Sequence, residues 1–397
     1  MLDRRSDRTW GQTHIQRFTV SYEFPVVFTR DAFDAENPTL VDIVRRLEPD
    51  KRHRLAVFLD DGVRKAMPGL PRAIERYAAA HSRSLALAGD IVHVPGGEAI
   101  KNDPAALPGL LAALLERSID RHSYAIAIGG GAVLDAVGYA AAIFHRGIRH
   151  IRFPTTVLAQ DDSGVGVKNA LNAFGLKNLV GTFAPPFAVV NDGAFIDRLS
   201  AREKRGGMAE AVKVALIRDR AFFEWIERNA DALAGFDPNS LDVLIERSAD
   251  LHMRQIAKGG DPFETGSARP LDYGHWSAHK IETLTNHAVG HGEAVAIGIA
   301  LDTRYSVLAG HLRAGEDDRV RRLLRTLGFR LWDDVLGVRE PSGRLAVLKG
   351  LRDFQEHLGG ELTVTLLAEI GRGVEVNAMD EALVEQAVGW LREAWAG

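Results

Sequence analysis

The 397-residue sequence contains no cysteine. Disulfide bonds and thiolate metal sites are therefore excluded, and any bound metal must use histidine and carboxylate ligands. The absence of cysteine also fits a reducing compartment. No apolar run approaches the roughly 18 residues of a membrane span, and the basic residues 1–16 lack the apolar core of a secretory signal. We therefore predict a cytoplasmic protein without a membrane partner.

The sequence also lacks an excess of positive charge, because 49 Lys and Arg residues are balanced by 53 Asp and Glu residues. The resulting net charge of -4 argues against a general nucleic-acid binder, so no nucleic-acid partner is expected. Internal repeats and low-complexity linkers are missing too. The hydrophobic fraction of 46% and the charged fraction of 26% are those of an ordinary soluble enzyme. The length predicts about two domains.

Short apolar runs alternate with helical patterns in the first half of the chain. Strands are expected near residues 22–29, 54–61, 91–96, 124–129, 148–156 and 187–192, and helices near residues 40–48, 104–119 and 132–145. Such alternation predicts a doubly wound, largely parallel sheet. Helical periodicity dominates after Asp192, and only residues 361–371 resemble a strand.

The predicted fold is therefore an α/β N-terminal doubly wound nucleotide-binding domain followed by a mainly α-helical C-terminal domain. We expect an N-terminal extension over residues 1–18, the α/β domain over 19–192 and the helical domain over 193–397. The cleft between the two domains is the expected active site.

A glycine turn in the first half suggests a nucleotide site. Gly129, Gly130 and Gly131 follow an apolar strand and open a helix, where backbone N–H groups can approach a pyrophosphate. A plain tight turn explains the same glycines, and the run is not the G-x-G-x-x-G fingerprint. Asp135, one turn into the helix, would orient a cofactor or cap the turn.

Polar side chains follow the next strand. Thr155 and Thr156 stand at its expected carboxyl end, which is where parallel sheets bind ligands. Residues 159–178 then read as a glycine-punctuated loop that carries Asp162, Lys168, Asn172, Lys177 and Asn178. These residue types suit a phosphorylated polyol, although a solvated loop is the alternative.

Residues 271–293 contain four histidines, at positions 275, 279, 287 and 291. If residues 275–284 form a helix, His275 and His279 lie four apart on one face. Imidazole is the commonest side-chain metal ligand, and a carboxylate such as Glu210 completes a three-ligand site with an open position. Lys213 lies three residues after Glu210. Scattered surface histidines are the alternative interpretation.

Taken together, the motifs at residues 96–102, 128–147, 153–169, 175–183, 206–217, 272–282 and 291–298 resemble those of the 3-dehydroquinate synthase, or sugar phosphate cyclase, superfamily. The resemblance covers residues 20–370. It implies a homodimeric enzyme that binds NAD in its first domain and zinc or cobalt at the domain cleft. Its substrate would be a small sugar phosphate, cyclised by alcohol oxidation, phosphate elimination, ketone reduction and an intramolecular aldol closure.

The resemblance also implies roles for individual residues. The matching metal ligands are Glu210, His275 and His291. The matching substrate contacts are Lys168, Asn178, Lys213 and His279, with Asp162 near nicotinamide and substrate. Arg146 matches an arginine that the family lends across the dimer to the partner's substrate phosphate. The matching NAD contacts are Asp60, Glu98, Lys101, Gly130, Gly131, Asp135, Thr155, Thr156 and Lys177.

The sequence departs from a typical 3-dehydroquinate synthase just before the first metal histidine. Where that enzyme has an arginine and an asparagine, this chain has Ala268 and Asp272, with Arg269 shifted by one position. A lysine of the preceding helix is replaced by Arg254. Because the arginine and the lysine hold the substrate carboxylate in the family, an aspartate here would repel a carboxylate but accept hydrogen bonds from a hydroxymethyl group.

This pattern is similar to cyclases that act on sedoheptulose 7-phosphate. Retention of His279 most resembles the 2-epi-valiolone synthase type, so a C7 cyclitol is the predicted product. A 3-dehydroquinate synthase remains the alternative, with Arg254 or Arg269 restoring carboxylate binding. A metal-dependent polyol dehydrogenase would normally have Ala-Lys after the Asp135 position, where this chain has Ala-Val-Gly. A non-catalytic paralogue would not need Lys213 or a complete set of metal ligands. Because this chain has both, a catalytic role is favoured.

Overall fold

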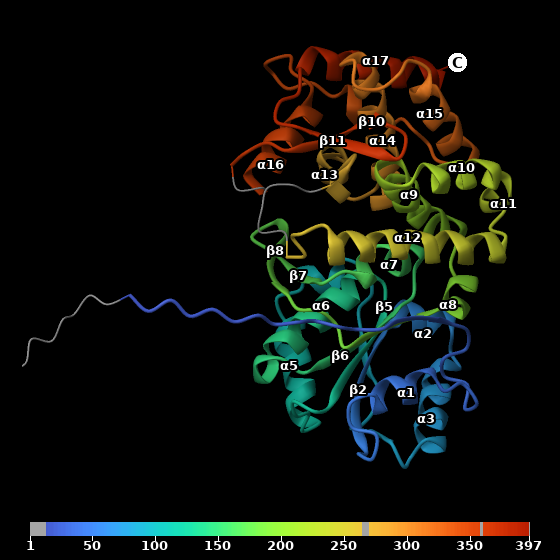
Figure 1. Ribbon diagram of the computed structural model, residues 1–397, viewed down its shortest axis with the longest axis vertical. Coiled ribbons are helices and arrows are strands. Elements are labelled where there is room, and N and C mark those ends of the chain that lie inside the picture. The colour runs from blue at the N-terminus through green and yellow to red at the C-terminus, as the bar shows by residue number, and fades with distance from the viewer. Residues whose placement is uncertain (1–12, 264–269, 358–359, 397) are drawn as a thin grey trace, which may run out of the picture.

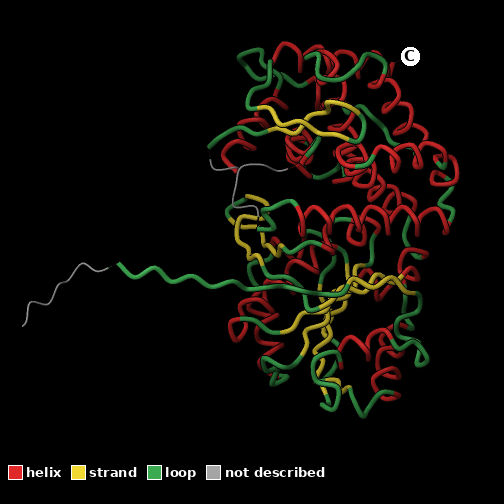
Figure 2. Tube along the Cα trace, in the orientation of Figure 1, coloured by secondary structure: helices red, strands yellow, loops and turns green. Residues whose placement is uncertain are grey.

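The computed structural model describes residues 13–263, 270–357 and 360–396, and these form two stacked parts (Figure 1). The lower part in Figure 1 is built around a sheet, and the upper part is mainly helical. Helix α12 lies between the two parts, and α9 lies above it in the upper part. The Cα trace in Figure 2 shows the same separation, with most strands below and mostly helices above.

The large sheet confirms the predicted doubly wound domain. Its strands run in the order β1-β9-β6-β5-β2-β3, with β4 also paired to β2, and every pair is parallel. The strands are β1 (Val26–Thr29), β2 (His53–Asp60), β3 (Leu85–Leu87), β4 (Val92–Val94), β5 (Tyr124–Gly129), β6 (Arg149–Pro154) and β9 (Ala188–Asp192). The short strand β3 was not predicted from the sequence.

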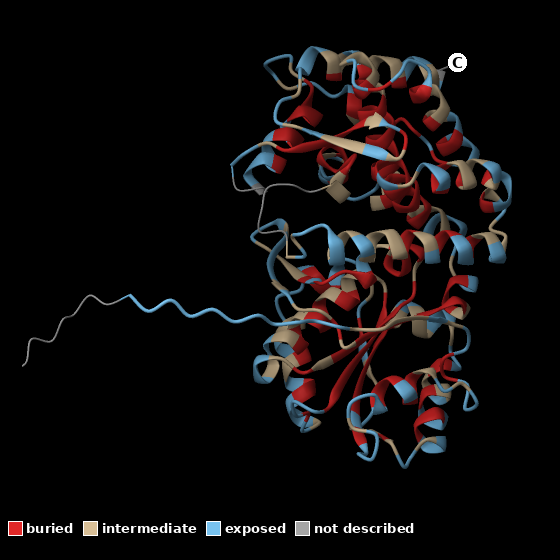
Figure 3. Cartoon of the chain, viewed as in Figure 1, coloured by how far each residue is buried: buried red, intermediate tan, exposed pale blue. Residues whose placement is uncertain are grey.

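Helices cover both faces of this sheet, which explains why its strands are apolar almost throughout. Along β2, Leu55, Val57 and Leu59 pack on one side, whereas Ala56 and Phe58 pack on the other. The helices of this part are α1 (Thr39–Arg45), α2 (Asp61–Ala66), α3 (Leu70–Ala80), α4 (Ala99–Asn102), α5 (Ala106–Glu116), α6 (Gly131–Ile143), η1 (Phe144–Arg146), α7 (Val157–Asp161) and η2 (Ser163–Val165). The buried strands and the exposed outer helix faces are visible in Figure 3.

The expectation of a loop over residues 159–178 is wrong for most of its length. Strands β7 (Lys168–Ala173) and β8 (Leu176–Phe183) form an antiparallel hairpin. Its two-residue turn places Phe174 and Gly175 at φ values of 52° and 77°. Two-residue hairpin turns of this kind require positive φ at both positions, but phenylalanine rarely adopts positive φ, so its presence does not indicate a turn.

The second part confirms the predicted helical domain. Its elements are α8 (Gly193–Asp197), α9 (Ala201–Arg218), α10 (Arg220–Arg228), α11 (Ala230–Ala234), α12 (Pro238–Lys258), η3 (Pro270–Asp272), α13 (His275–Leu284), α14 (His291–Leu308), α15 (Glu316–Thr326), η4 (Asp334–Gly337), η5 (Ala346–Leu348), α16 (Lys349–His357), β10 (Val364–Glu369), β11 (Arg372–Val376) and α17 (Glu381–Ala396). The hairpin partner β11 was missed. The exact domain boundary at residue 192 stays a prediction.

Helix α9 is the centre of this part. All its residues from Gly207 to Ile217 are buried, because α7, α12 and α14 pack around it. The buried stretch is apolar except for Glu210 and Lys213, whose charges are paired with each other. Its first turn is fixed by a capping box between Ser200 and Glu203. Among the described residues, no helix is both long and apolar enough for a membrane crossing.

At its N-terminal end, the described chain begins as an exposed extended segment over residues 13–23 (Figure 1). Part of the predicted extension, residues 1–12, lies outside the described residues.

Candidate active site

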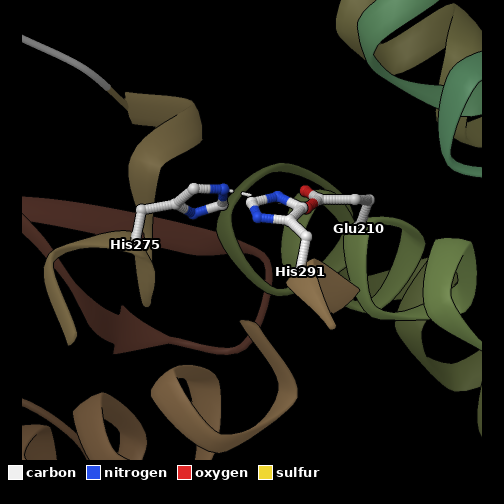
Figure 4. Close-up of side chains that lie close together, drawn as sticks. All are labelled: Glu210, His275 and His291. Atoms are coloured by element: carbon white, nitrogen blue, oxygen red, sulfur yellow. Dashed lines mark ion pairs between the residues drawn. The ribbon is translucent and has the colours of Figure 1, made fainter. Parts of the chain in front are cut away.

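Three helices bring the predicted metal ligands together at the meeting of the two parts. Glu210 lies within α9, His275 begins α13 and His291 begins α14. The Nε2 atoms of His275 and His291 lie 3.7 Å and 3.2 Å from Glu210 Oε1 (Figure 4). We call Glu210, His275 and His291 the ligand triad.

Two glycines permit this approach. Gly274, immediately before His275, has φ +79°, a conformation that side-chain-bearing residues rarely adopt. A Cβ on Gly292 would lie 2.0 Å from the backbone oxygen of Gly206, so α14 starts in direct contact with α9. The close packing of these helices brings His291 to Glu210.

The triad has the chemistry of a divalent metal site. Both carboxylate oxygens of Glu210 are buried; Oε2 is paired with Lys213, and Oε1 accepts no hydrogen bond within the described part of the chain. His275 Nδ1 donates to the backbone oxygen of Tyr273 at 3.1 Å, and His291 Nδ1 donates to Glu282 Oε2 at 3.1 Å. Both imidazoles therefore turn Nε2 toward Glu210, which is how partners of the other ring nitrogen orient metal-binding histidines.

A second ligand set shares one of these histidines. His279, Glu282 and His291 also lie close enough to hold one ion. However, the two oxygens of Glu282 already accept hydrogen bonds from Lys177 and His291. In the ligand triad, by contrast, the Nε2 atoms of both histidines face Glu210 Oε1, which accepts no hydrogen bond among the described residues, so the triad is the better candidate.

Lys213 places a positive charge next to the triad. Its Nζ contacts Glu210 Oε2 and lies 3.4 Å from Asp162 Oδ1. Burial lowers the pKa of Lys213, but the charges of Asp162 and Glu210 outweigh that effect and raise it. Burial raises the pKa of Glu210, yet Lys213 reverses this and brings it to about 2. Lys213 and Glu210 are therefore ionised.

Sequence reasoning missed His252, which lies on α12. Its Nδ1 donates to Asp162 Oδ1 at 2.9 Å. Burial alone would raise the pKa of Asp162, but Lys213 and His252 hold it well below its usual range. Asp162 is thus an ionised carboxylate fixed between two helices. No local pattern marks His252, because its partner is 90 positions away in the sequence.

Several predicted NAD contacts lie together beside the glycine turn. Helix α6 begins at Gly131, and a Cβ there would lie 2.8 Å from Ser163 Oγ. Lys101 Nζ donates to Asp135 Oδ2 at 2.7 Å and also contacts Asn178. Asn172 connects Asn178 to Glu98 through two hydrogen bonds of 2.9 Å. Asn172 and Asn178 therefore attach the β7–β8 hairpin to Glu98 and Lys101 of the sheet domain.

Three of the remaining predicted NAD contacts lie at or just after the carboxyl ends of strands. Asp60 ends β2 and caps α2, accepting from the Gly62 N–H at 2.6 Å. Thr155 follows β6, and Thr156 caps α7. Lys177, on β8, bonds to Glu282 rather than to the Lys101 group.

Other predicted substrate residues are more dispersed. His279 lies beside the triad, with its ring centroid 5.4 Å from that of His275, and Lys168 begins β7. Arg254 is exposed and bonds to Asp250 on the same helix. Arg146 is exposed at the end of η1. Arg269 and Ala268 lie outside the described residues.

Asp272 ends the short helix η3, three residues before His275. Its negative charge acts on the site, because it contributes to the raised pKa of Lys213. This places an acidic group where the family resemblance implies an asparagine.

A buried carboxylate behind the site leads to a stability prediction. Asp302 accepts from Trp276 Nε1 at 2.9 Å and from the Gly274 N–H at 3.1 Å, which fixes the turn before His275. Burial outweighs these bonds and raises the pKa of Asp302 to about 7. The native state therefore holds a proton that the unfolded chain releases above about pH 4. The stabilisation by that proton is lost as pH rises from about 4 to about 7.

We expect the free energy of unfolding to fall across this window by about 4 kcal/mol more in the native sequence than in Asp302→Asn. Urea titrations of both proteins at several pH values measure the difference. Parallel curves for the two proteins would contradict the prediction. Other carboxylates affect both proteins equally, so the comparison isolates Asp302.

Comparisons with known proteins agree with this geometry. Residues 91–206 match the model of the 3-dehydroquinate synthase N-terminal domain, and residues 207–346 match that of its C-terminal domain. The chain is 38% identical over 325 residues to a 3-dehydroquinate synthase of Pelobacter propionicus, covering 81% of this chain and 88% of that one.

Solved structures give a second comparison. The 2-epi-5-epi-valiolone synthase of Streptomyces hygroscopicus, with NAD+ and Zn2+ bound, superposes with a TM-score of 0.83 at 26% identity, over 96% of this chain and 100% of that one. A 2-deoxy-scyllo-inosose synthase complexed with carbaglucose-6-phosphate, NAD+ and Co2+ gives a TM-score of 0.74 at 23% identity, over 92% and 96% of the two chains, and shows the shared fold. Because the two family models together span residues 91–346, the chain belongs to the 3-dehydroquinate synthase family of enzymes.

Proposed function

We propose that this protein is a sugar phosphate cyclase that converts sedoheptulose 7-phosphate to a C7 cyclitol of the 2-epi-valiolone type. The observation that carries the substrate assignment is the charge around the triad. Asp272 adds a negative charge beside Lys213 and His275, and the exposed Arg254 is paired with Asp250. Among the described residues, this arrangement suits a hydroxymethyl group better than a carboxylate.

The proposed cofactors are NAD and a zinc or cobalt ion. The ligand triad would hold the metal, and the glycine turn with Lys101 and Asp135 would hold NAD. A structural relative at 26% identity was solved with NAD+ and Zn2+ bound, which supports both assignments. When bound, the metal would polarise the reacting oxygen and NAD would exchange a hydride with the substrate.

The chain's own groups would position the substrate around these cofactors. The Lys213 ammonium lies beside Glu210 and would stabilise negative charge that develops on a substrate oxygen. The neighbouring Asp162 is ionised and would accept a hydrogen bond from a hydroxyl group. Lys168 and Asn178 would contact the phosphate or hydroxyl groups, and His279 would complete the polar wall next to the triad.

The alternative function is that of a 3-dehydroquinate synthase, favoured by the curated relatives at 37% and 38% identity. Incubation with sedoheptulose 7-phosphate and, separately, with the carboxylated seven-carbon substrate of that enzyme distinguishes the two. Phosphate release and product identity are measured for each. Our proposal requires the neutral sugar to be cyclised at the higher rate. Net NADH formation from an unphosphorylated polyol would instead indicate a dehydrogenase.

We also propose a homodimer with shared active sites, in which Arg146 binds the substrate phosphate of the partner subunit. Arg146 is exposed and lies at the end of η1, whereas Lys213 lies beside the triad. Mixing inactive Arg146→Ala with inactive Lys213→Ala subunits is expected to restore about a quarter of the native activity. Half of the dimers are then hybrids, and one of their two sites is intact.

The measurement is phosphate release after subunit exchange has been verified by mass spectrometry. A mixture of Lys213→Ala with Lys213→Met subunits is the matched control and should stay inactive. If exchange is complete and the first mixture also stays inactive, Arg146 does not act across the dimer.

A further inference from the structure

Glu282 connects the two parts of the molecule through one buried carboxylate. It lies on α13 and is 3% exposed. Oε1 accepts from Lys177 Nζ of the β7–β8 hairpin at 2.9 Å. Oε2 accepts from Nδ1 of the triad residue His291 at 3.1 Å. The family resemblance assigned no role to Glu282.

The contacts on each side of Glu282 lead to the two proposed cofactor sites. On one side, His291 Nε2 lies 3.2 Å from Glu210. On the other side, Lys177 is followed by Asn178, which contacts Lys101. Lys101 in turn bonds to Asp135 on α6, the helix that opens at the glycine turn. Polar contacts therefore lead from α6 to Asn178 and from Lys177 to the ligand triad, and the chain itself joins these two neighbouring residues, with Glu282 at the crossing between the two parts.

We propose that Glu282 is a positioning residue that couples NAD binding to metal binding. This inference rests on the proposed function, because it assumes that both cofactors bind where assigned. Glu282 holds the His291 Nδ1 proton, so that Nε2 keeps its lone pair for the metal. The same carboxylate fixes Lys177, so ordering of the hairpin by NAD also orders Glu282 and His291.

The expected coupling is positive. A cofactor that orders Lys177 reduces the conformational entropy that the metal must remove from His291, and the reverse also holds. Coupling between two sites is reciprocal, and typical values correspond to 5–150-fold changes in affinity. We therefore expect NAD+ to lower the zinc dissociation constant at least fivefold, and zinc to lower the NAD+ dissociation constant by the same factor.

The informative substitution is Glu282→Gln, because glutamine keeps the shape but has one acceptor oxygen. It can accept from His291 or from Lys177 but no longer from both. Zinc affinity without NAD+ is expected to fall about 10–100-fold, the usual cost of losing such a partner. The ratio of zinc affinities with and without NAD+ should approach one.

Two further variants separate the explanations. Lys177→Met leaves the bond between Glu282 and His291 intact, so zinc affinity without NAD+ should stay near the native value while the coupling disappears. Glu227→Gln is the matched control, because both carboxylate oxygens of Glu227 accept hydrogen bonds from Arg319 rather than from a residue of the triad or the hairpin. Both its zinc affinity and its coupling should stay native.

The experiment measures zinc dissociation constants by competition with a chelating dye, using the full-length protein at zero and saturating NAD+. Native coupling in Glu282→Gln would overturn the proposal, whatever the zinc affinity. Zinc loss as complete as in Glu210→Ala would also overturn it, because Glu282 would then be a ligand. If the native protein bound no zinc or no NAD+, the proposed function itself would fail. Lys177→Met keeps the coupling test informative if Glu282→Gln does not fold.

Discussion

Replacing Glu210 with alanine is expected to remove both the bound metal and the cyclase activity. Glu210 supplies the only carboxylate of the ligand triad, and its buried Oε1 faces the Nε2 atoms of both histidines. Loss of one of three ligands leaves two histidines that cannot retain the ion through dialysis. We expect metal content to fall from about one ion per chain to near zero. Phosphate release should fall at least about a thousandfold, equivalent to about 4 kcal/mol of barrier.

Metal content is measured by elemental analysis, and activity by phosphate release with added zinc. Glu210→Gln is the companion variant, since it keeps the shape of the side chain beside the buried Lys213. Glu224→Ala is the control, because Glu224 is a surface carboxylate that bonds to Arg220 on its own helix. Normal metal content together with a normal rate in Glu210→Ala would show that the metal lies elsewhere.

Those parts of the site that depend on local sequence could be predicted. The sequence predicted a helix over residues 275–284, and α13 spans these residues. In a helix, residues four apart lie on one face, and the rings of His275 and His279 are indeed neighbours. The glycine turn likewise opens α6 at Gly131. Each of these features is decided by a few neighbouring residues, so a periodicity or a glycine run reveals it.

The parts that depend on long-range packing could not be predicted. His252 and Glu282 have partners 90 and 105 positions away, and no spacing rule relates such residues. The β7–β8 hairpin was missed for a different reason. Its turn uses Phe174 at positive φ, which is strained for phenylalanine, so the residue type gives no sign of a turn. Arg254, placed near the substrate by resemblance, bonds to Asp250 at the helix surface.

The charges of the site bear on the charge that its substrate can carry. The described site contains the ionised residues Lys213, Asp162 and Glu210, and Asp272 adds a further negative charge next to them. A metal ion would compensate part of this charge, and a substrate phosphate would need the cations Lys168 and Arg146. A second anionic group on the substrate would have to lie near Asp272, whose negative charge would oppose it. This charge arrangement is the reason for proposing a substrate whose second end is neutral.

The substrate comparison gives the second large expected effect. We expect kcat/KM for sedoheptulose 7-phosphate to exceed that for the carboxylated seven-carbon substrate by about a thousandfold. This corresponds to about 4 kcal/mol, on the scale of an unpaired charge in a binding site. Both constants are measured by phosphate release under the same metal and NAD+ concentrations.

Asp272→Asn should narrow this difference, because it removes the like charge and restores the amide of a typical 3-dehydroquinate synthase. Two unit charges about 6 Å apart interact by about 2–3 kcal/mol at an effective dielectric constant near 20. The carboxylated substrate should therefore gain roughly a hundredfold in relative kcat/KM. Asp353→Asn is the control, because Asp353 is an exposed partner of Lys280. A native enzyme that prefers the carboxylated substrate, with a ratio unchanged in Asp272→Asn, would refute the substrate assignment and leave 3-dehydroquinate synthase as the function.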